Sequence, residues 1–211
     1  MTHYPNGLPR PLVIEGDQAE CLTNIFRDDI NLAIWRRSLR PKIVQFVEAL
    51  VQRAGKLERF TSLEPTQSVA GILPAWAQAL EGVEDWLADV EQLVNMYRCL
   101  FEPAAVGVRL HVIESPMCPR FHVDRVPVRL LCTYQGAGTE WLPEPLAKRP
   151  IKPGPLPEQP VKNHQLLRLP MGAVALLKGE AWEGNEGRGV VHRSPPPEEG
   201  ARVVLGVDWL A

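Results

Sequence analysis

The chain has 211 residues, of which 45% are hydrophobic and 23% are charged, values close to the average of globular proteins. This length supports one domain with a substantial core, and the composition excludes a chain that is disordered throughout. Lys and Arg total 23 against 25 Asp and Glu, a net charge of -2, so the chain lacks the basic excess that a general nucleic-acid binder needs.

The four cysteines form no C-x-x-C pair, and so few scattered thiols are typical of a reducing compartment. The N-terminal residues contain no basic segment followed by an apolar run, which a signal peptide requires. No apolar stretch reaches the roughly 18 residues that span a bilayer. We therefore expect a cytoplasmic protein without a membrane segment.

Helices are expected in the first half of the chain. Residues 1–40 mix prolines with short apolar runs, which predicts irregular structure and one or two short strands. A helix is predicted from Pro41, because apolar residues recur at spacings of three and four as far as Leu57 and proline suits the first helical position. A second helix is predicted after Pro74, with a broad apolar face that Gly82 can interrupt.

Strands are expected in the second half of the chain. Side chains alternate with period 2, which is typical of half-buried strands, over residues 106–112 and 128–134. Further strands, separated by turn signals, are predicted at residues 165–169, 173–177, 189–192 and 202–209. Helices followed by short strands predict one α+β domain over residues 1–211, with a sandwich or barrel in its second half. The helical part would cover residues 1–103 and the β core residues 104–211.

A proline-rich segment interrupts the predicted strands. Seven of the 21 prolines fall within residues 141–160, which therefore cannot form a helix or a central strand. The segment is either a passive surface connector or a lid beside an active site, since long loops in compact domains often carry function.

Two histidines and one aspartate are candidate metal ligands. His122 and Asp124 form an H-x-D pair at the entry to a predicted strand, where period 2 places both side chains on one face. His192 lies on another predicted strand. Two imidazoles and one carboxylate, with coordination positions left open, are typical of the facial triad of non-haem Fe(II) oxygenases.

An arginine that could bind an anion follows the second histidine along the chain. Arg202 comes ten residues after His192 and opens a hydrophobic strand. Its planar guanidinium could bind the far carboxylate of a 2-oxo acid that chelates the metal. Arg129 and Arg193 are competing candidates for this role.

Other interpretations of these ligands stay open. His122 and Asp124 could form a structural hydrogen-bonded pair, and His192 could be an ordinary core histidine. Cys118 could join the three ligands in a closed tetrahedral zinc site, which would be structural rather than catalytic. Zinc could also replace iron in an open site, because affinity for such ligands favours it.

The segment GEAWEGNEGRG precedes His192 and has two interpretations. Trp182 and Asn185 could contact a substrate at the mouth of the site, or the segment could be a glycine-rich turn with solvated acids. It lacks the Gly-Lys-Ser/Thr ending of a phosphate loop.

The order of these motifs resembles the 2-oxoglutarate/Fe(II) dioxygenase superfamily, in particular its prolyl-hydroxylase-like branch. The resemblance covers roughly residues 106–209. It implies N-terminal supporting helices followed by a double-stranded β-helix, or jelly roll. It also implies that His122, Asp124 and His192 hold Fe(II) and that Arg202 binds 2-oxoglutarate. Tyr134 would be a candidate to hydrogen-bond this co-substrate, or else a core aromatic with a satisfied hydroxyl.

Most of the chain is also similar to a bacterial family, domain of unknown function 1826. The stretches PMCPRFHVDRVPVRLLCTYQGAGTEWL and ALLKGEAWEGNEGRGVVHRSPP carry this similarity. The function expected from the superfamily is a hydroxylase-type oxygenase that acts on an unknown small-molecule or protein substrate. A non-enzymatic metal-binding or metal-homeostasis protein on the same scaffold is the main alternative, and an interaction module that uses the proline-rich segment is another.

Overall fold

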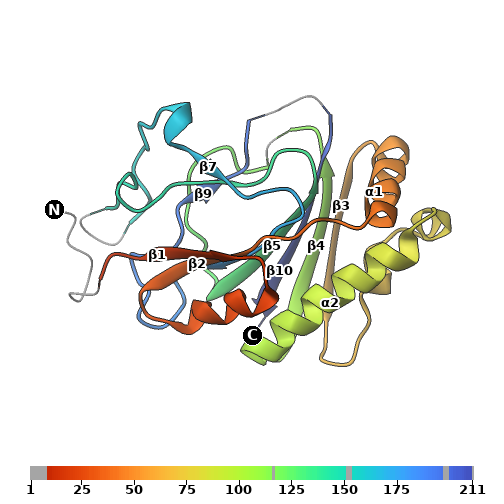
Figure 1. The fold of residues 1–211 in the computed structure, drawn as a ribbon, viewed down its shortest axis with the longest axis horizontal. Coiled ribbons are helices and arrows are strands. Elements are labelled where there is room, and N and C mark those ends of the chain that lie inside the picture. The colour runs from red at the N-terminus through yellow and green to blue at the C-terminus, as the bar shows by residue number, and fades with distance from the viewer. Residues whose placement is uncertain (1–8, 116, 151–153, 197–199, 211) are drawn as a thin grey trace.

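The computed structural model describes residues 9–115, 117–150, 154–196 and 200–210. Within these residues the chain is a mixed α+β protein with a large, mostly antiparallel sheet, a small sheet and few helices (Figure 1). The regular elements are β1 (Leu12–Gly16), β2 (Ile30–Trp35), α1 (Pro41–Ala54), β3 (Leu57–Leu63), α2 (Val83–Phe101), β4 (Ala105–Ile113), β5 (Val128–Gln135), β6 (Glu140–Trp141), β7 (Leu167–Arg168), β8 (Val174–Lys178), β9 (His192–Arg193) and β10 (Arg202–Leu210). Short 3-10 helices occur at Ala19–Phe26, Val69–Ile72, Ala75–Ala79 and Asn163–Gln165.

The strands of the second half alternate between the two sheets. The large sheet has the order β1-β2-β8-β5-β10-β4-β3, and the small sheet has the order β7-β6-β9. A single bridge between His122 and His192 extends the small sheet beyond β9. The chain therefore passes from β4 to the segment at His122, back to β5, and then through β6 and β7 before it returns to β8.

Segments of the first half complete both edges of the large sheet. The strands β1 and β2 pair in parallel beside β8, and β3 pairs with β4 at the other edge. The prediction that the first helix reaches Leu57 is wrong: α1 ends at Ala54, and Gly55 follows with a left-handed φ of 60°. Leu57 instead begins β3, where it gains backbone hydrogen bonds from β4.

Both helices pack on one face of the large sheet. α1 begins at Pro41, as predicted, and buries an apolar stripe against the sheet. The second predicted helix divides, because Gly82 adopts a φ of 81° immediately before α2. A Cβ atom at Gly82 would lie 2.3 Å from the Lys42 carbonyl oxygen, so glycine alone fits this junction between the helices.

The opposite face of the large sheet turns toward the small sheet. On β10, Val203, Leu205 and Val207 join the core beneath the helices. Because side chains alternate along a strand, Arg202 and Asp208 point to the other face. A second apolar cluster between the sheets contains residues of β2 and β8 together with Trp141 of β6. Polar side chains on this inner face range from buried, as for Asp208, to partly exposed, as for Arg109.

The prediction for the proline-rich segment, residues 141–160, is wrong at its first residue, because Trp141 belongs to β6, the central strand of the small sheet. Residues 142–150 and 154–160 contain no helix or strand, as their composition predicts. It contributes Leu142, Ala147 and Leu156 to a small apolar cluster that also contains Val191 and Phe121. The segment therefore packs beside the residues that flank His122 and His192. No helix in the described ranges is both long and apolar enough to cross a bilayer.

Candidate metal centre

Backbone pairing brings the two candidate histidines together. The His122 amide donates to the His192 carbonyl at 2.9 Å, and the His192 amide donates to the His122 carbonyl at 3.0 Å. Directly opposed residues of an antiparallel pair present their side chains to the same face. The two imidazole centroids consequently lie 4.4 Å apart, although the residues are far apart in the sequence.

The hydrogen bonds of each imidazole fix its tautomer. The Nδ1 atom of His122 lies 2.9 Å from the Arg120 carbonyl oxygen, and the Nδ1 atom of His192 lies 2.9 Å from the Val190 carbonyl oxygen. Since a carbonyl oxygen only accepts, each Nδ1 carries the proton and each Nε2 presents a lone pair. A backbone carbonyl that orients a ring in this way is typical of metal-ligating histidines.

The Asp124 carboxylate faces both lone pairs. Its Oδ2 lies 3.5 Å from His192 Nε2, and its Oδ1 lies 4.0 Å from His122 Nε2. Oδ2 is buried and has no hydrogen-bond partner among the described residues. Two buried acceptor atoms at this separation repel each other, which costs free energy unless a cation lies between them.

The ligand atoms of His122, Asp124 and His192 all lie within 4.8 Å of one another. This spread is compatible with bonds of about 2.0–2.2 Å from nitrogen and oxygen ligands to one ion after small side-chain adjustments. The unpartnered Oδ2 and the two exposed lone pairs thus fit a divalent metal ion.

His192 is held in the form that a metal requires. Burial lowers its pKa to about 4, the charge of Asp124 opposes this shift, and His122 adds to it. The imidazole is therefore neutral near neutral pH, and a neutral imidazole is the form that coordinates metals.

A chain of ion pairs orients the Asp124 carboxylate. Arg129 donates from Nη1 to Asp124 Oδ1 at 2.7 Å and from Nε to Asp208 Oδ1 at 2.5 Å. Arg109 donates from Nε to the other oxygen of Asp208 at 2.8 Å. Asp208 is only 1% exposed, so it is a buried carboxylate that fixes Arg129. Arg129 in turn occupies Oδ1 of Asp124 and leaves Oδ2 for a metal.

Sequence reasoning assigned no role to Asp208 and treated Arg129 only as a possible co-substrate anchor. The signal was present in the alternation, because both residues occupy positions on their strands that point away from the apolar helix side. An arginine and an aspartate that point to the same face from two neighbouring strands indicate a buried ion pair.

Arg202 lies on the same inner face as the ion-pair chain. Its Nε donates to the Ala137 carbonyl at 2.8 Å, and its Nη2 donates to Thr139 Oγ1 at 2.8 Å. Within the described residues no carboxylate pairs with it, and burial lowers its pKa to about 10. A partly buried guanidinium that neutral groups hold in place, without a counter-charge, is suited to binding an anion.

Three other candidates do not direct their side chains to the cluster. Tyr134 lies on the helix side of the large sheet, where its hydroxyl donates to Asp89 Oδ2 at 2.6 Å. Arg193 donates to Glu140 at 2.8 Å and stacks on the Phe121 ring. Cys118 is exposed and is not part of the ligand group, so the structure does not assemble the four-ligand zinc site.

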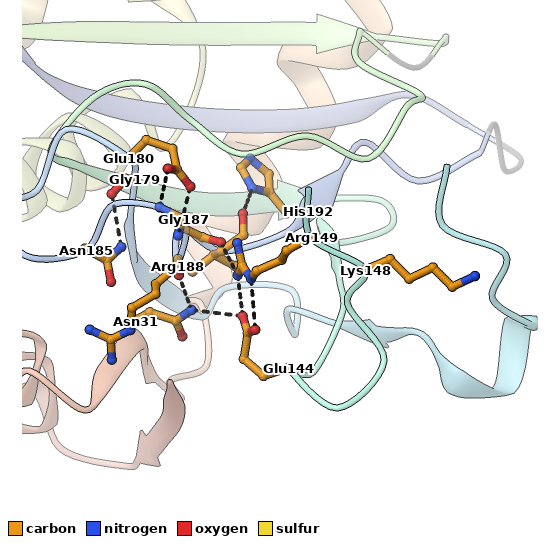
Figure 2. Close-up of polar contacts among 12 residues, drawn as sticks. Asn31, Glu144, Lys148, Arg149, Gly179, Glu180, Asn185, Gly187, Arg188 and His192 are labelled. Atoms are coloured by element: carbon orange, nitrogen blue, oxygen red, sulfur yellow. Dashed lines mark hydrogen bonds and ion pairs between the residues drawn. The ribbon is translucent and has the colours of Figure 1, made fainter. Parts of the chain in front are cut away.

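The loop before His192 is held by its own polar contacts. Asn185 is buried and donates to the Gly179 carbonyl at 3.0 Å, while the Glu180 carboxylate accepts from the Gly187 and Gly189 amides (Figure 2). These side chains stabilise the turn. Trp182 packs instead against Phe101 in the aromatic group on the helix side.

The proline-rich segment is tied to the same loop. Glu144 is buried and pairs with Arg149, and Arg149 also donates to the Gly189 carbonyl at 2.7 Å (Figure 2). Asn31 of β2 donates to the Arg188 carbonyl at 2.9 Å. The backbone that precedes His192 is therefore held by hydrogen bonds from both the proline-rich segment and β2.

Solved structures share this fold at low sequence identity. A protein from Shewanella oneidensis, proposed to be an oxygenase, matches with a TM-score of 0.52 and 11% identity over 95% of this chain and 90% of that chain. A C-terminally truncated protein from Neurospora crassa, in apo form, has a TM-score of 0.52 and 12% identity over 99% and 97% of the two chains. A proposed 2OG-Fe(II) oxygenase family protein from Caulobacter crescentus has a TM-score of 0.50 and 15% identity over 94% and 86%.

These similarities establish the fold, and at such identities they do not extend to activity. The curated proteins include no match to the chain. The model of the family described as "Protein of unknown function (DUF1826)" matches residues 16–208, which is most of the chain. The chain therefore belongs to the DUF1826 family.

Proposed function

We propose that this protein is an Fe(II)- and 2-oxoglutarate-dependent oxygenase, built on a jelly roll with supporting helices. One observation carries the proposal: two imidazole lone pairs converge with a carboxylate oxygen that has no hydrogen-bond partner among the described residues, and two of the three ligand residues are buried. The Caulobacter crescentus protein described as a 2OG-Fe(II) oxygenase has a similar fold, which supports the same class.

The donor set favours Fe(II) over a structural metal. His122, Asp124 and His192 would supply three ligands, and a site with two imidazoles and one carboxylate leaves positions for a chelating co-substrate and dioxygen. When bound, the metal supplies the oxidative chemistry that amino-acid side chains cannot perform. Zinc could bind the same ligands without supporting that chemistry.

The protein's own residues would bind and orient the reactants. Arg202 would bind the far carboxylate of 2-oxoglutarate, because it has no counter-charge within the described part of the chain and is positioned by Ala137 and Thr139. Arg129 would hold Asp124 by one oxygen, which keeps that ligand in a fixed orientation. The small sheet would shield the reacting groups from water. The substrate, which this proposal leaves open as a small molecule or a protein, would enter at the remaining open side of the metal.

Anaerobic titration tests the proposal. Fe(II) should bind the purified protein at one site per chain, and 2-oxoglutarate should then bind only to the loaded protein. Exposure to air, with ascorbate present as the reductant, should convert 2-oxoglutarate to succinate and carbon dioxide slowly, even without substrate. The Arg202→Leu variant should still bind Fe(II) but should lose 2-oxoglutarate.

Two results would overturn it. Tight zinc binding with no measurable affinity for Fe(II) would favour the metal-homeostasis alternative. Fe(II) binding without any binding of 2-oxoglutarate would remove the co-substrate assignment. The Asp124→Ala variant serves as the metal-free control, since it removes the carboxylate ligand.

A further inference from the structure

A half-buried histidine on the inner face of the large sheet has no hydrogen-bond partner for its ring among the described residues. His111 belongs to β4, and both of its ring nitrogens are buried without a hydrogen-bond partner in the described residues. One of the two nitrogens must carry a proton, so the ring leaves a donor and an acceptor unsatisfied. Unpaired polar atoms of this kind cost free energy and call for an explanation such as a missing ligand.

The register of β4 and β10 places His111 beside Arg202. His111 lies opposite Val204, and Arg202 is the next residue on the same face of β10. Diagonal neighbours on adjacent antiparallel strands lie about 7–8 Å apart at their backbones, within reach of long side chains. An imidazole and an arginine without a counter-charge among the described residues therefore border the same part of the inner face.

Burial is the main factor that favours the neutral form of the His111 ring. Burial lowers the pKa of His111; Glu58 on β3 opposes the shift, and Arg109 and Arg202 add to it. A neutral imidazole can donate one hydrogen bond to an anion without adding another positive charge beside the two arginines.

The surrounding residues do not supply the missing partner. Glu58 lies opposite His111 on β3, but its side chain is half exposed and pairs with Lys56 at 2.9 Å. Arg109 is committed to Asp208. His111 is also outside the group of candidate metal ligands. Among the described residues His111 lacks a hydrogen-bond partner and Arg202 lacks a counter-charge, and an anionic ligand on the inner face would supply both.

We propose that His111 donates a hydrogen bond to the far carboxylate of the 2-oxo acid that Arg202 binds. The two residues then form a dicarboxylate-selective pocket, in which the arginine supplies charge and the imidazole supplies a directional donor. This inference rests on the proposed function, and it adds His111 as a specificity-determining residue of the co-substrate site.

Calorimetry on the anaerobic Fe(II)-loaded protein tests the contact. His111→Leu should weaken 2-oxoglutarate binding by about 10- to 100-fold, as expected for the loss of a hydrogen bond to a charged group. His111→Gln, which retains a donor, should recover much of the affinity. Iron affinity should be the same in all forms. The matched control His164→Leu replaces an exposed histidine of the Asn163–Gln165 turn and should bind 2-oxoglutarate like the wild type.

A shorter co-substrate analogue locates the contact. 2-Oxobutanoate keeps the 2-oxo acid group but lacks the far carboxylate, so His111→Leu should not change its affinity for the loaded protein. Equal weakening of both ligands would overturn the assignment to the far carboxylate. Unchanged 2-oxoglutarate binding in His111→Leu would overturn the role of His111 altogether.

A measurement on the wild type covers the case in which the leucine variant fails to fold. In the zinc-loaded protein, the ring ¹⁵N signals of His111 should shift on addition of 2-oxoglutarate, but not on addition of 2-oxobutanoate. Absence of a shift at saturating 2-oxoglutarate contradicts the inference. Failure of wild-type, metal-loaded protein to bind 2-oxoglutarate at all would instead overturn the proposed function.

Discussion

His192 Nε2 and Asp124 Oδ2 lie 3.5 Å apart without a hydrogen between them. The proton of this imidazole is on Nδ1, where the Val190 carbonyl accepts it. Both facing atoms therefore carry lone pairs in a buried setting, and a shared cation would turn their repulsion into two bonds. Binding of a metal should consequently stabilise the folded chain.

Metal addition is expected to raise the melting temperature. A ligand at 100 times its dissociation constant stabilises the folded state by about 2.7 kcal/mol. For a chain of this size that corresponds to a rise of about 5–10 °C. Differential scanning fluorimetry with Zn(II), or with Fe(II) under anaerobic conditions, measures it. Asp124→Ala should show no rise, and an equal rise in this variant would place the metal elsewhere.

The stability of the metal-free protein is expected to fall with pH below 6.5. The pKa of His192 is about 4 in the folded state, below the ordinary value of 6.5 that applies to the unfolded chain. The unfolded state thus binds more protons between these two values, so stability is complete above pH 6.5 and is lost as pH falls toward 4. The free energy of unfolding should fall by about 3 kcal/mol at most.

Urea denaturation at several pH values measures this loss. His192→Gln removes the titrating ring and should flatten the curve over the same interval. A wild-type curve as flat as that of His192→Gln would show that His192 is not buried in its neutral form. Proton competition at His192 should lower the metal affinity of the folded wild type only as the pH approaches about 4, the pKa of this imidazole.

Replacement of Arg129 is expected to damage both stability and metal binding. Arg129→Met leaves Asp208 and Asp124 without their shared cation, and removal of one partner from a buried ion pair costs about 3–5 kcal/mol. Metal affinity should fall by about 10- to 100-fold, because Asp124 loses the group that orients it.

Arg109→Met is the matched control, since Arg109 also contacts Asp208 but its side chain is 44% exposed. This substitution should lower the free energy of unfolding by less than about 1 kcal/mol and leave the metal affinity unchanged. Chemical denaturation and competition with a chelator measure the two quantities. Equal effects of both variants would show that Arg129 has no special link to Asp124.

Tyr134→Phe is expected to affect stability alone. Its hydroxyl donates to the buried Asp89, which Arg37 also binds at 2.8 Å, so the change removes one buried hydrogen bond and costs about 1–3 kcal/mol. Binding of 2-oxoglutarate to the Fe(II)-loaded variant should match the wild type, because the large sheet separates Tyr134 from the inner face. Weaker binding in this variant would restore Tyr134 as a co-substrate residue.

The sequence by itself determined the features that depend on local spacing. Alternation places Arg202 and Asp208 on one face of β10 and the apolar residues on the other, because a strand has a period of two. The start of α1 at Pro41 and the break at Gly82 follow from backbone preferences of single residues. The H-x-D spacing likewise identified two residues that face one point.

Only the tertiary structure decided which faces meet. Alternation along β5 separates Tyr134 from Arg129, but it does not say which of the two faces the small sheet. The pairing of His122 with His192, the buried Asp208 that fixes Arg129, and the unpartnered ring of His111 all depend on contacts between strands distant in the sequence. Such contacts form because separate apolar surfaces are buried together. No local sequence pattern specifies which polar groups become hydrogen-bonded on folding and which are left available to a ligand.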